Sequence, residues 1–222
     1  MSKGRRLWRG GAIVALGLAG LALQARADEI PAGPSETEII EKSIPSAPGA
    51  DGLFDAAGYR LKDYRAPVPA IAPGAQTVTL AEVQALQAAG AVLIDVMGAQ
   101  RFHIDAAGRW ITPPGPGGGH LTIPGAIWLP VVGWGALEPW QEDYLRQSLA
   151  DLTAEDPARP VVVFCKTDCW LSWNAARRIA GMGLKKVCWF PGGSDDWTGA
   201  GMALTRAHPW PLRSGPDRPF AP

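Results

Sequence analysis

Two cysteines, Cys165 and Cys169, are the residues of this chain best placed for chemistry. They directly follow the apolar run 161–164 and precede a helix predicted over residues 172–181. A thiol between a strand end and a helix start meets unpaired backbone N–H groups and the positive end of a helix dipole, and both favour the reactive thiolate. Three residues separate the cysteines, so a loop can bring the two sulfur atoms together. The pair therefore predicts nucleophilic or redox chemistry of thiols.

Residues 1–27 have the pattern of an export signal. Basic residues precede an apolar stretch, and Ala25 and Ala27 stand at the two small positions that a signal peptidase reads. We expect cleavage after Ala27 and a mature protein in the periplasm, with no further membrane association. A retained anchor is the alternative, but the apolar stretch is shorter than the roughly 20 residues of a spanning helix. The choice between the general and the twin-arginine export route stays open.

The charge of the mature chain bears on its partners. Removal of residues 1–27 leaves 195 residues with 16 Lys and Arg against 21 Asp and Glu, a net charge of −5. This acidic balance does not favour a nucleic-acid partner. The length suits one domain with a substantial core and an added arm.

Composition divides the mature chain into three parts. We predict a Pro- and Gly-rich N-terminal extended arm over residues 28–76, a domain over 77–207 and a Pro-rich tail over 208–222. The first half of the arm is equally compatible with a disordered linker. From Leu53 onward, aromatic residues give the arm something to bury, so we expect it to pack over the domain.

Helix and strand patterns alternate through the predicted domain. Thr79 and Glu82 form a capping-box pattern that begins a helix, and Gly90 ends that helix. A second helix is predicted to end before Pro157. Strands are predicted from apolar runs at residues 91–96, 127–129, 161–164 and 187–190. The pattern predicts an α/β fold with a mainly parallel central sheet, in which sites gather at the carboxyl ends of strands.

Ordered landmarks along this domain resemble a rhodanese domain. They are residues 91–96, His120 ahead of 123–126, residues 161–165, and Pro191-Gly192-Gly193 followed by Trp197 and Gly201. The resemblance covers roughly residues 77–207 and implies a three-layer rhodanese-like fold, with an unusually long loop between Phe102 and His120. It also implies that Cys165 is the sulfur-accepting nucleophile, that loop N–H groups face a persulfide on it, and that no resident cofactor is required.

A narrower resemblance rests on the cysteine motif itself. The segment 165–170, with Ser172-Trp173-Asn174-Ala175-Ala176 after it, is similar to the rhodanese-like CxxxCW-motif proteins associated with PQQ-dependent catabolism. The arm segments 58–60 and 63–69 also resemble that family. The resemblance implies an exported bacterial protein linked to a periplasmic PQQ-dependent dehydrogenase system and alcohol oxidation. It brings no settled reaction with it.

Residues around the cysteines are predicted to form the active loop. They are Lys166, Thr167, Asp168, Trp170, Leu171 and Ser172. Lys166 is the only cation and Asp168 repels anions, so thiosulfate is a doubtful donor. The expected partner is a small sulfur donor or a thiol acceptor. Cys169 could resolve a persulfide on Cys165 by attacking it, which would leave a disulfide and release sulfide.

Several alternative readings remain open. The pair could be a structural disulfide, although so small a ring stabilises little, or a dithiol redox or cofactor-binding module of the periplasmic system. Copper or zinc would need a distant histidine, and the histidines show no ligand spacing, so no metal site is predicted. We expect Trp170 to pack, Cys188 to be a core thiol, and Asp95 to anchor loop backbone at its strand end.

Overall fold

The computed structural model describes residues 52–99, 103–104, 110–111 and 120–212. The predicted export signal, the first part of the arm, the end of the tail and most of the long loop lie outside these ranges, so cleavage after Ala27 and export stay predictions. Within the described ranges, no helix is both long enough and apolar enough to cross a membrane.

A five-stranded parallel sheet forms the centre of the described domain, with strand order β1-β8-β7-β2-β6. The strands are β1 (Gln76–Thr77), β2 (Val92–Asp95), β6 (Ile127–Trp128), β7 (Val161–Phe164) and β8 (Val187–Phe190). Every residue of β2, β7 and β8 is buried, because both faces of the sheet are covered. The predicted parallel sheet is confirmed.

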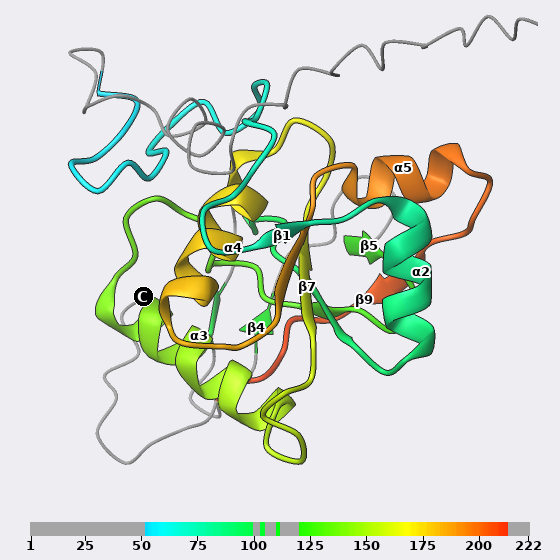
Figure 1. The fold of residues 1–222 in the computed structure, drawn as a ribbon. Coiled ribbons are helices and arrows are strands. Elements are labelled where there is room, and N and C mark those ends of the chain that lie inside the picture. Colours follow the sequence, from blue (N-terminus) through cyan, green and yellow to red (C-terminus); the bar gives the residue numbers. More distant parts are fainter. Residues whose placement is uncertain (1–51, 100–102, 105–109, 112–119, 213–222) are drawn as a thin grey trace, which may run out of the picture. The chain divides into compact units, whose positions relative to one another are not determined.

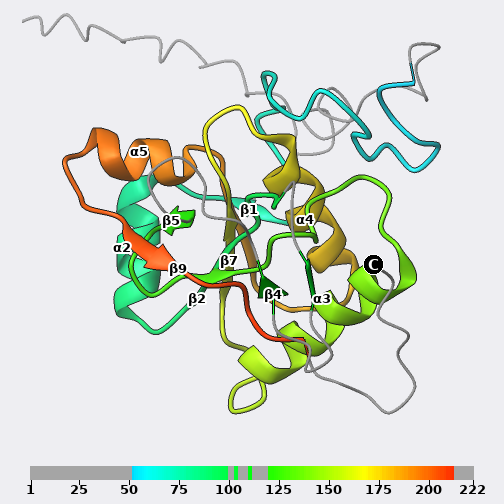
Figure 2. The same cartoon turned by 180° about the vertical axis from the view of Figure 1, so that it is seen from behind.

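Helices cover both faces of this sheet and make three layers (Figures 1 and 2). One face packs against α3 (Pro139–Leu152) and α4 (Trp170–Gly181). The opposite face packs against α2 (Leu80–Ala88) and α5 (Gly193–Gly199). The capping box at the start of α2 is present as predicted, with Thr79 and Glu82 bonded reciprocally. The three-layer α/β fold is therefore confirmed.

Two antiparallel pairs supplement the main sheet. β3 (His103–Ile104) pairs with β4 (Trp110–Ile111), and both lie in the segment predicted to be a long loop. β5 (His120–Thr122) pairs with β9 (Thr205–Ala207). The start of the predicted tail is packed as well, since Trp210 donates its N–H to the Trp128 carbonyl.

The register of the central strands places their carboxyl ends at one level. Asp95 at the end of β2 pairs with Phe164 at the end of β7, and Phe164 pairs with Phe190 at the end of β8. Cys165 follows Phe164 at this edge, between the segments that leave β2 and β8. Ligand sites of open parallel sheets lie at this edge, so the fold brings the predicted nucleophile to the expected place.

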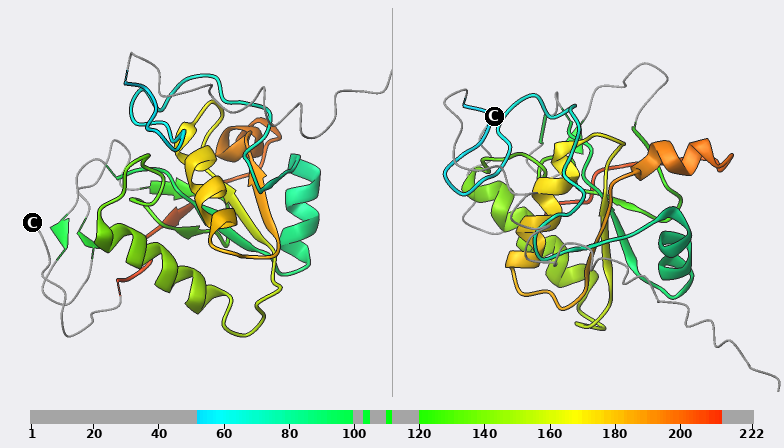
Figure 3. Two further views of the ribbon diagram at one scale, coloured as in Figure 1. Left: turned by 60° about the vertical axis from the view of Figure 1, so that its left-hand side comes forward. Right: turned by 45° about the horizontal axis from the view of Figure 1, so that its top comes forward.

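The described part of the arm runs along α4, as the cyan and yellow segments show in both views of Figure 3. Its first residues form a small hairpin in which Phe54 pairs with Arg60. The turn is closed by the Asp55 carboxylate, which accepts from the Tyr59 N–H at 2.8 Å. Gln76, placed at the end of the arm by composition, belongs to β1 and pairs with Cys188 of β8.

Candidate functional site

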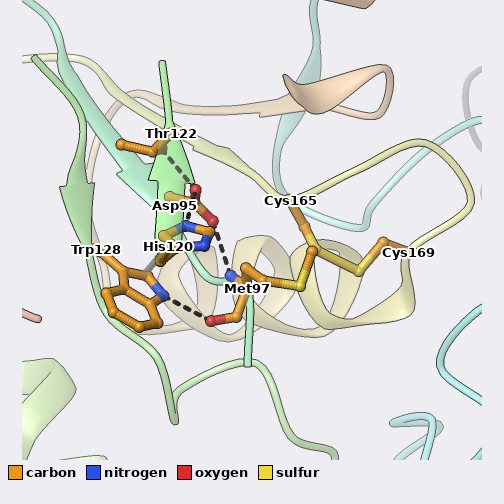
Figure 4. A network of polar contacts seen from close by, with 7 residues as sticks. All are labelled: Asp95, Met97, His120, Thr122, Trp128, Cys165 and Cys169. Atoms are coloured by element: carbon orange, nitrogen blue, oxygen red, sulfur yellow. Dashed lines mark hydrogen bonds and ion pairs between the residues drawn. A yellow bond between two sulfur atoms is a disulfide. The ribbon is translucent and has the colours of Figure 1, made fainter. Parts of the chain in front are cut away.

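The structure joins Cys165 and Cys169 in a disulfide, with Cα atoms 6.3 Å apart (Figure 4). Cys165 is 1% exposed and Cys169 is 2% exposed. Cys165 follows the last residue of β7, and Cys169 is the N-cap of α4, with φ −121° and ψ 106°. The ring between them closes because Asp168 adopts a left-handed conformation with φ 52°, which aspartate tolerates better than most residues.

The turn after β8 holds the first half of the loop. Ser194 donates its N–H to the Cys165 carbonyl at 3.0 Å, and Lys166 forms a bridge with Gly193. Gly193 has φ 54°, and a Cβ atom there would collide with the Cys165 carbonyl, so only glycine fits this close approach. The backbone position of the predicted nucleophile is thus fixed from β8 as well as from β7.

Thr167 binds the same turn through its side chain and its backbone. Its hydroxyl donates to the Gly192 carbonyl at 3.0 Å, and its N–H donates to Asp195 Oδ2 at 3.2 Å. A carboxylate of the protein therefore already uses one loop amide that the sequence led us to expect would be unpaired. A dianionic donor would meet Asp195 at this point, together with Asp168.

The arm binds the second half of the loop. Ala66 donates its N–H to the Asp168 carbonyl at 3.1 Å, and Trp170 donates its N–H to the Tyr64 carbonyl at 2.9 Å. Arg65 lies opposite Cys169 in this bridge and donates from Nη1 to the Thr167 carbonyl at 2.7 Å. The first N–H of α4 thus faces the arm, contrary to the expectation of an open helix start.

The six predicted loop residues divide into two groups. Lys166, Thr167 and Asp168 are exposed and form the turn between the cysteines. The other three, Trp170, Leu171 and Ser172, are buried in the first turn of α4, which begins two residues earlier than predicted. This part of the prediction is wrong about their local structure. The reason is that Cys169 caps the helix without a side-chain hydrogen bond, so the sequence lacks the usual start signal.

Trp170 is a packing residue, as expected for a tryptophan at a helix start. It is 4% exposed, and its ring lies edge-on to Phe54 at 5.3 Å and to Trp173 at 5.1 Å. The Arg60 guanidinium lies 5.1 Å from the centre of the same ring. Arm and helix residues therefore enclose the indole.

A polar network supports the other side of Cys165 (Figure 4). Asp95 accepts from the Met97 N–H at 2.8 Å, and Trp128 Nε1 donates to the Met97 carbonyl at 2.7 Å. Met97 Sδ then lies 3.9 Å from Cys165 Sγ. Asp95 and Trp128 thus fix the backbone of Met97, whose sulfur contacts Cys165. The predicted anchoring role of Asp95 is confirmed.

His120 and Thr122 complete this network. Both contact Asp95 Oδ2, His120 through Nε2 at 2.7 Å and Thr122 through its hydroxyl at 2.6 Å. The His120 ring also stacks on Trp128, with centroids 4.3 Å apart. Sequence reasoning missed Met97, because no local pattern distinguishes it from a core methionine. Only the pairing of β2 with β7 brings it to the cysteine.

The third cysteine has different surroundings. Cys188 lies inside β8, is free and is 5% exposed. Burial, with a smaller contribution from the nearby Glu82 carboxylate, raises the pKa of its thiol above the usual value. Cys188 is therefore the core thiol that the sequence predicted.

Among the described residues, no cluster of metal ligands is found, and a surface hollow lies away from the cysteine pair. No group of three or more His, Cys, Asp or Glu side chains in the described ranges is arranged to hold a metal ion. A surface hollow of about 400 Å³ lies between the arm hairpin and the helices α3 and α4. It includes Tyr59, Arg146 and Arg178 but none of the predicted site residues. Arg178 uses its guanidinium to bind the carbonyls of Val132 and Gly135, which is a structural role.

Comparison with known families matches the Rhodanese-like domain to residues 79–200, more than half of the chain. The chain belongs to the rhodanese-like family. The domain is thus of the sulfurtransferase type, and the first resemblance drawn from sequence is confirmed at this level. In rhodanese domains a cysteine persulfide carries the sulfur without a separate cofactor.

Similar solved structures come from longer proteins. The thiosulfate sulfurtransferase from Pseudomonas aeruginosa is 26% identical over 61% of this chain and 21% of its own length, with a TM-score of 0.38. Wild-type EanB is 21% identical over 68% of this chain and 36% of its own, with a TM-score of 0.39. YnjE is 21% identical over 64% and 33%, with a TM-score of 0.37. The chain spans between a fifth and about a third of these proteins, and no curated protein matches it significantly.

Proposed function

We propose that this protein carries sulfane sulfur as a persulfide on Cys165 and that Cys169 is its resolving cysteine. The main support is the position of the pair, with Cys165 at the carboxyl end of β7 in a rhodanese-like domain and Cys169 within disulfide distance of it. A sulfurtransferase of the simplest kind needs one cysteine, so a second sulfur at bonding distance points to a redox-coupled version of that chemistry.

The proposed reaction has two steps. The Cys165 thiolate attacks the outer sulfur of a donor persulfide, which forms the Cys165 persulfide and releases the donor thiolate. The Cys169 thiolate then attacks Cys165 Sγ, which forms the Cys165–Cys169 disulfide while hydrosulfide leaves with the electron pair of the broken bond. Each step exchanges one sulfur–sulfur bond for another, so neither requires a separate oxidant.

Electrostatics favour a donor with little charge. Asp195 accepts from the Thr167 N–H, and Asp168 belongs to the same exposed turn. Lys166 is the only basic residue between the cysteines. The Arg65 guanidinium also reaches this turn, where it binds the Thr167 carbonyl. Two carboxylates thus balance two cations, and no excess of positive charge is left to bind a dianion. We therefore propose persulfides or organic polysulfides, whose sulfur chains carry at most one negative charge, as donors in preference to thiosulfate.

The proposed setting is the periplasm, beside a PQQ-dependent dehydrogenase system. This part rests on the sequence alone: the export-signal pattern of residues 1–27 and the similarity of the cysteine motif and arm segments to the CxxxCW proteins. In the structure those arm segments contact α4 and the loop, so the arm and the motif are physically linked. Such a link agrees with a family in which both occur together.

Intact mass of the mature protein tests the proposal. The protein is reduced, freed of reductant and exposed to an organic polysulfide, and we expect an added sulfur atom or, after resolution, the loss of two hydrogens. The variant Cys169→Ser should accumulate the persulfide on Cys165, because its resolving sulfur is missing. If that variant gains no adduct from any sulfane donor, sulfur transfer is excluded. If it behaves like the parent, the resolving role is excluded.

A second function is favoured by the disulfide itself. A buried cysteine pair at the start of a helix also suits a dithiol module that exchanges electrons without carrying sulfur. Such a module would cycle between dithiol and disulfide and show no adduct under any donor. The same mass measurement therefore separates the two functions.

A further inference from the structure

Met97 covers the sulfur of Cys165 on the side that faces away from Cys169. Its Sδ lies 3.9 Å from Cys165 Sγ, and Figure 4 shows the thioether and Cys169 on opposite sides of that sulfur. Cys165 is 1% exposed, whereas Met97 is partly exposed. The side chain of Met97 therefore stands between solvent and Cys165 Sγ.

The backbone of Met97 is fixed, so only its side chain can move aside. Its N–H binds the Asp95 carboxylate, and its carbonyl accepts from Trp128 Nε1. At the next residue, Gly98, a Cβ atom would lie 2.8 Å from the Trp134 ring, so this segment is closely packed as well. A methionine side chain is unbranched and has three rotatable bonds. Its rotation uncovers Cys165 Sγ without breaking a backbone hydrogen bond.

The side of Cys169 is covered by backbone instead. Arg65 of the arm pairs with Cys169, and backbone hydrogen bonds join the arm to Asp168 and Trp170 on either side. Access to Cys169 Sγ from this side requires the arm to detach, which breaks several hydrogen bonds together. The two sulfur atoms of the pair thus differ in what has to move before a reagent reaches them.

This difference bears on the proposed reaction. When one sulfur replaces another at a sulfur atom, the entering and the leaving group stand on opposite sides of that atom. In the resolving step the Cys169 thiolate forms a bond to Cys165 Sγ, and hydrosulfide leaves with the electron pair of the broken bond. Hydrosulfide therefore leaves on the side of Met97, where the disulfide state holds the thioether.

We infer that the Met97 side chain is the gate of Cys165: it closes over Sγ in the disulfide and turns aside when a sulfur atom is added to Cys165 or removed from it. The inference rests on the proposed function and adds the residue that controls access to its nucleophile. Met97 acts by position and takes no part in the bond changes. Opening of the gate leaves Cys169 covered by the arm, so external sulfur exchanges at Cys165.

Two single-cysteine backgrounds test the gate. Cys169→Ser leaves Cys165 as the thiol of the pair, and Cys165→Ser leaves Cys169. Each reduced full-length mature protein is mixed with dithiodipyridine: the thiolate attacks one sulfur of the probe, and the pyridinethione that leaves is followed by its absorbance. Trypsin cuts after Lys166 and Arg177, so each adduct is assigned to a single cysteine. Adding Met97→Ala should speed the reaction of Cys165 by about tenfold and change that of Cys169 by less than about twofold.

Three further variants separate a gate from general loosening. Met97→Leu fills a similar volume and should keep the Cys165 rate within about twofold of the parent. Met182→Ala removes another partly exposed methionine packed against the same core and should change neither rate by more than about twofold. Met97→Val keeps more apolar contact than alanine and should still speed Cys165 by about fourfold, so the test does not depend on the folding of one variant.

Two results would overturn the inference. One is a Cys165 rate in Met97→Ala and Met97→Val no higher than in Met182→Ala. The other is an equal gain at Cys165 and Cys169, which would show that the whole site has loosened.

The outcome is separable from that of the proposed function. A faster dithiodipyridine reaction of Cys165 in Met97→Ala, with no persulfide formed from an organic polysulfide, would support the gate and sink the sulfur-carrier proposal. A persulfide that forms on Cys165 at the same rate in the parent and in Met97→Ala would sink the gate alone.

Discussion

Cys165 and Cys188 lie on neighbouring parallel strands, and both are buried, yet their surroundings differ. Cys188 is inside β8, pairs with Val162 and faces the apolar layer that includes α2 and α5. Cys165 stands one residue beyond β7, where its carbonyl binds Ser194 and its sulfur contacts Cys169 and Met97. Burial is nearly the same for the two, so it cannot distinguish a core thiol from the proposed nucleophile. Position at a strand end, with a second sulfur in reach, does.

Replacing each cysteine gives the largest expected contrast. Cys165→Ser should abolish sulfur loading, because the sulfur acceptor is missing, whereas Cys188→Ala should load as the parent does. Intact mass after exposure to an organic polysulfide measures both. A sulfur adduct on Cys165→Ser in parental yield would contradict the assignment of Cys165 as nucleophile.

The variant Asp95→Asn tests the polar network that supports Cys165 and leaves the surroundings of Cys188 intact. The Asp95 carboxylate is 1% exposed and accepts from Met97, His120 and Thr122. An amide can satisfy only part of these bonds, so we expect the free energy of unfolding to fall by about 1 to 3 kcal/mol. Urea unfolding measures this loss. Alkylation of Cys188 should speed up by no more than the rise in the unfolded fraction that this loss produces, and a larger increase would show that the two sites are coupled.

The pH dependence of stability isolates Cys188. Its pKa is raised in the folded protein, so the folded state favours the neutral thiol more than the unfolded chain does. The stability it contributes is complete below the unfolded pKa, near 8.5, and is lost as pH rises through the higher folded value. Between pH 7 and a pH above 9, the urea midpoint should therefore fall further in the parent than in Cys188→Ala. The same pH dependence in both proteins would assign it to another group.

Glu82→Gln should produce the smallest effect. The carboxylate adds to the raised pKa of Cys188, so its removal should lower that pKa and slightly speed alkylation of Cys188 at high pH. Reactivity of the Cys165–Cys169 pair should not change, since Glu82 lies on α2 at the opposite face of the sheet. A change at the pair would contradict the separation of the two environments.

Much of the fold was predictable because its signals are local. Continuous apolar runs identify β2, β7 and β8, and the Thr79–Glu82 pattern identifies the start of α2. The position of Cys165 follows from the end of β7. These elements report their structure through their own residues, without reference to distant parts of the chain.

The remaining features depend on distant contacts. The early start of α4 requires the left-handed Asp168 and a cysteine cap, which no start signal marks. Met97 reaches Cys165 only through the pairing of β2 with β7. Trp170, Trp173 and Asn174 recur with a helical period in the sequence. Their partners are backbone carbonyls of the arm, which no side-chain pattern reveals. The sequence could therefore predict the nucleophile but not what encloses it.

The contact between the arm and α4 also determines where the chain can be shortened. The family match begins at residue 79, but the aromatic and amide side chains of α4 find their partners between residues 54 and 71. A chain that begins at residue 79 would expose the side chains of Trp170, Trp173 and Asn174, which the whole protein buries. It would also expose the edge of β8 that β1 covers. Such a fragment should aggregate or fail to fold on its own. We therefore expect the smallest autonomous folding unit to be larger than the family domain and to include the arm.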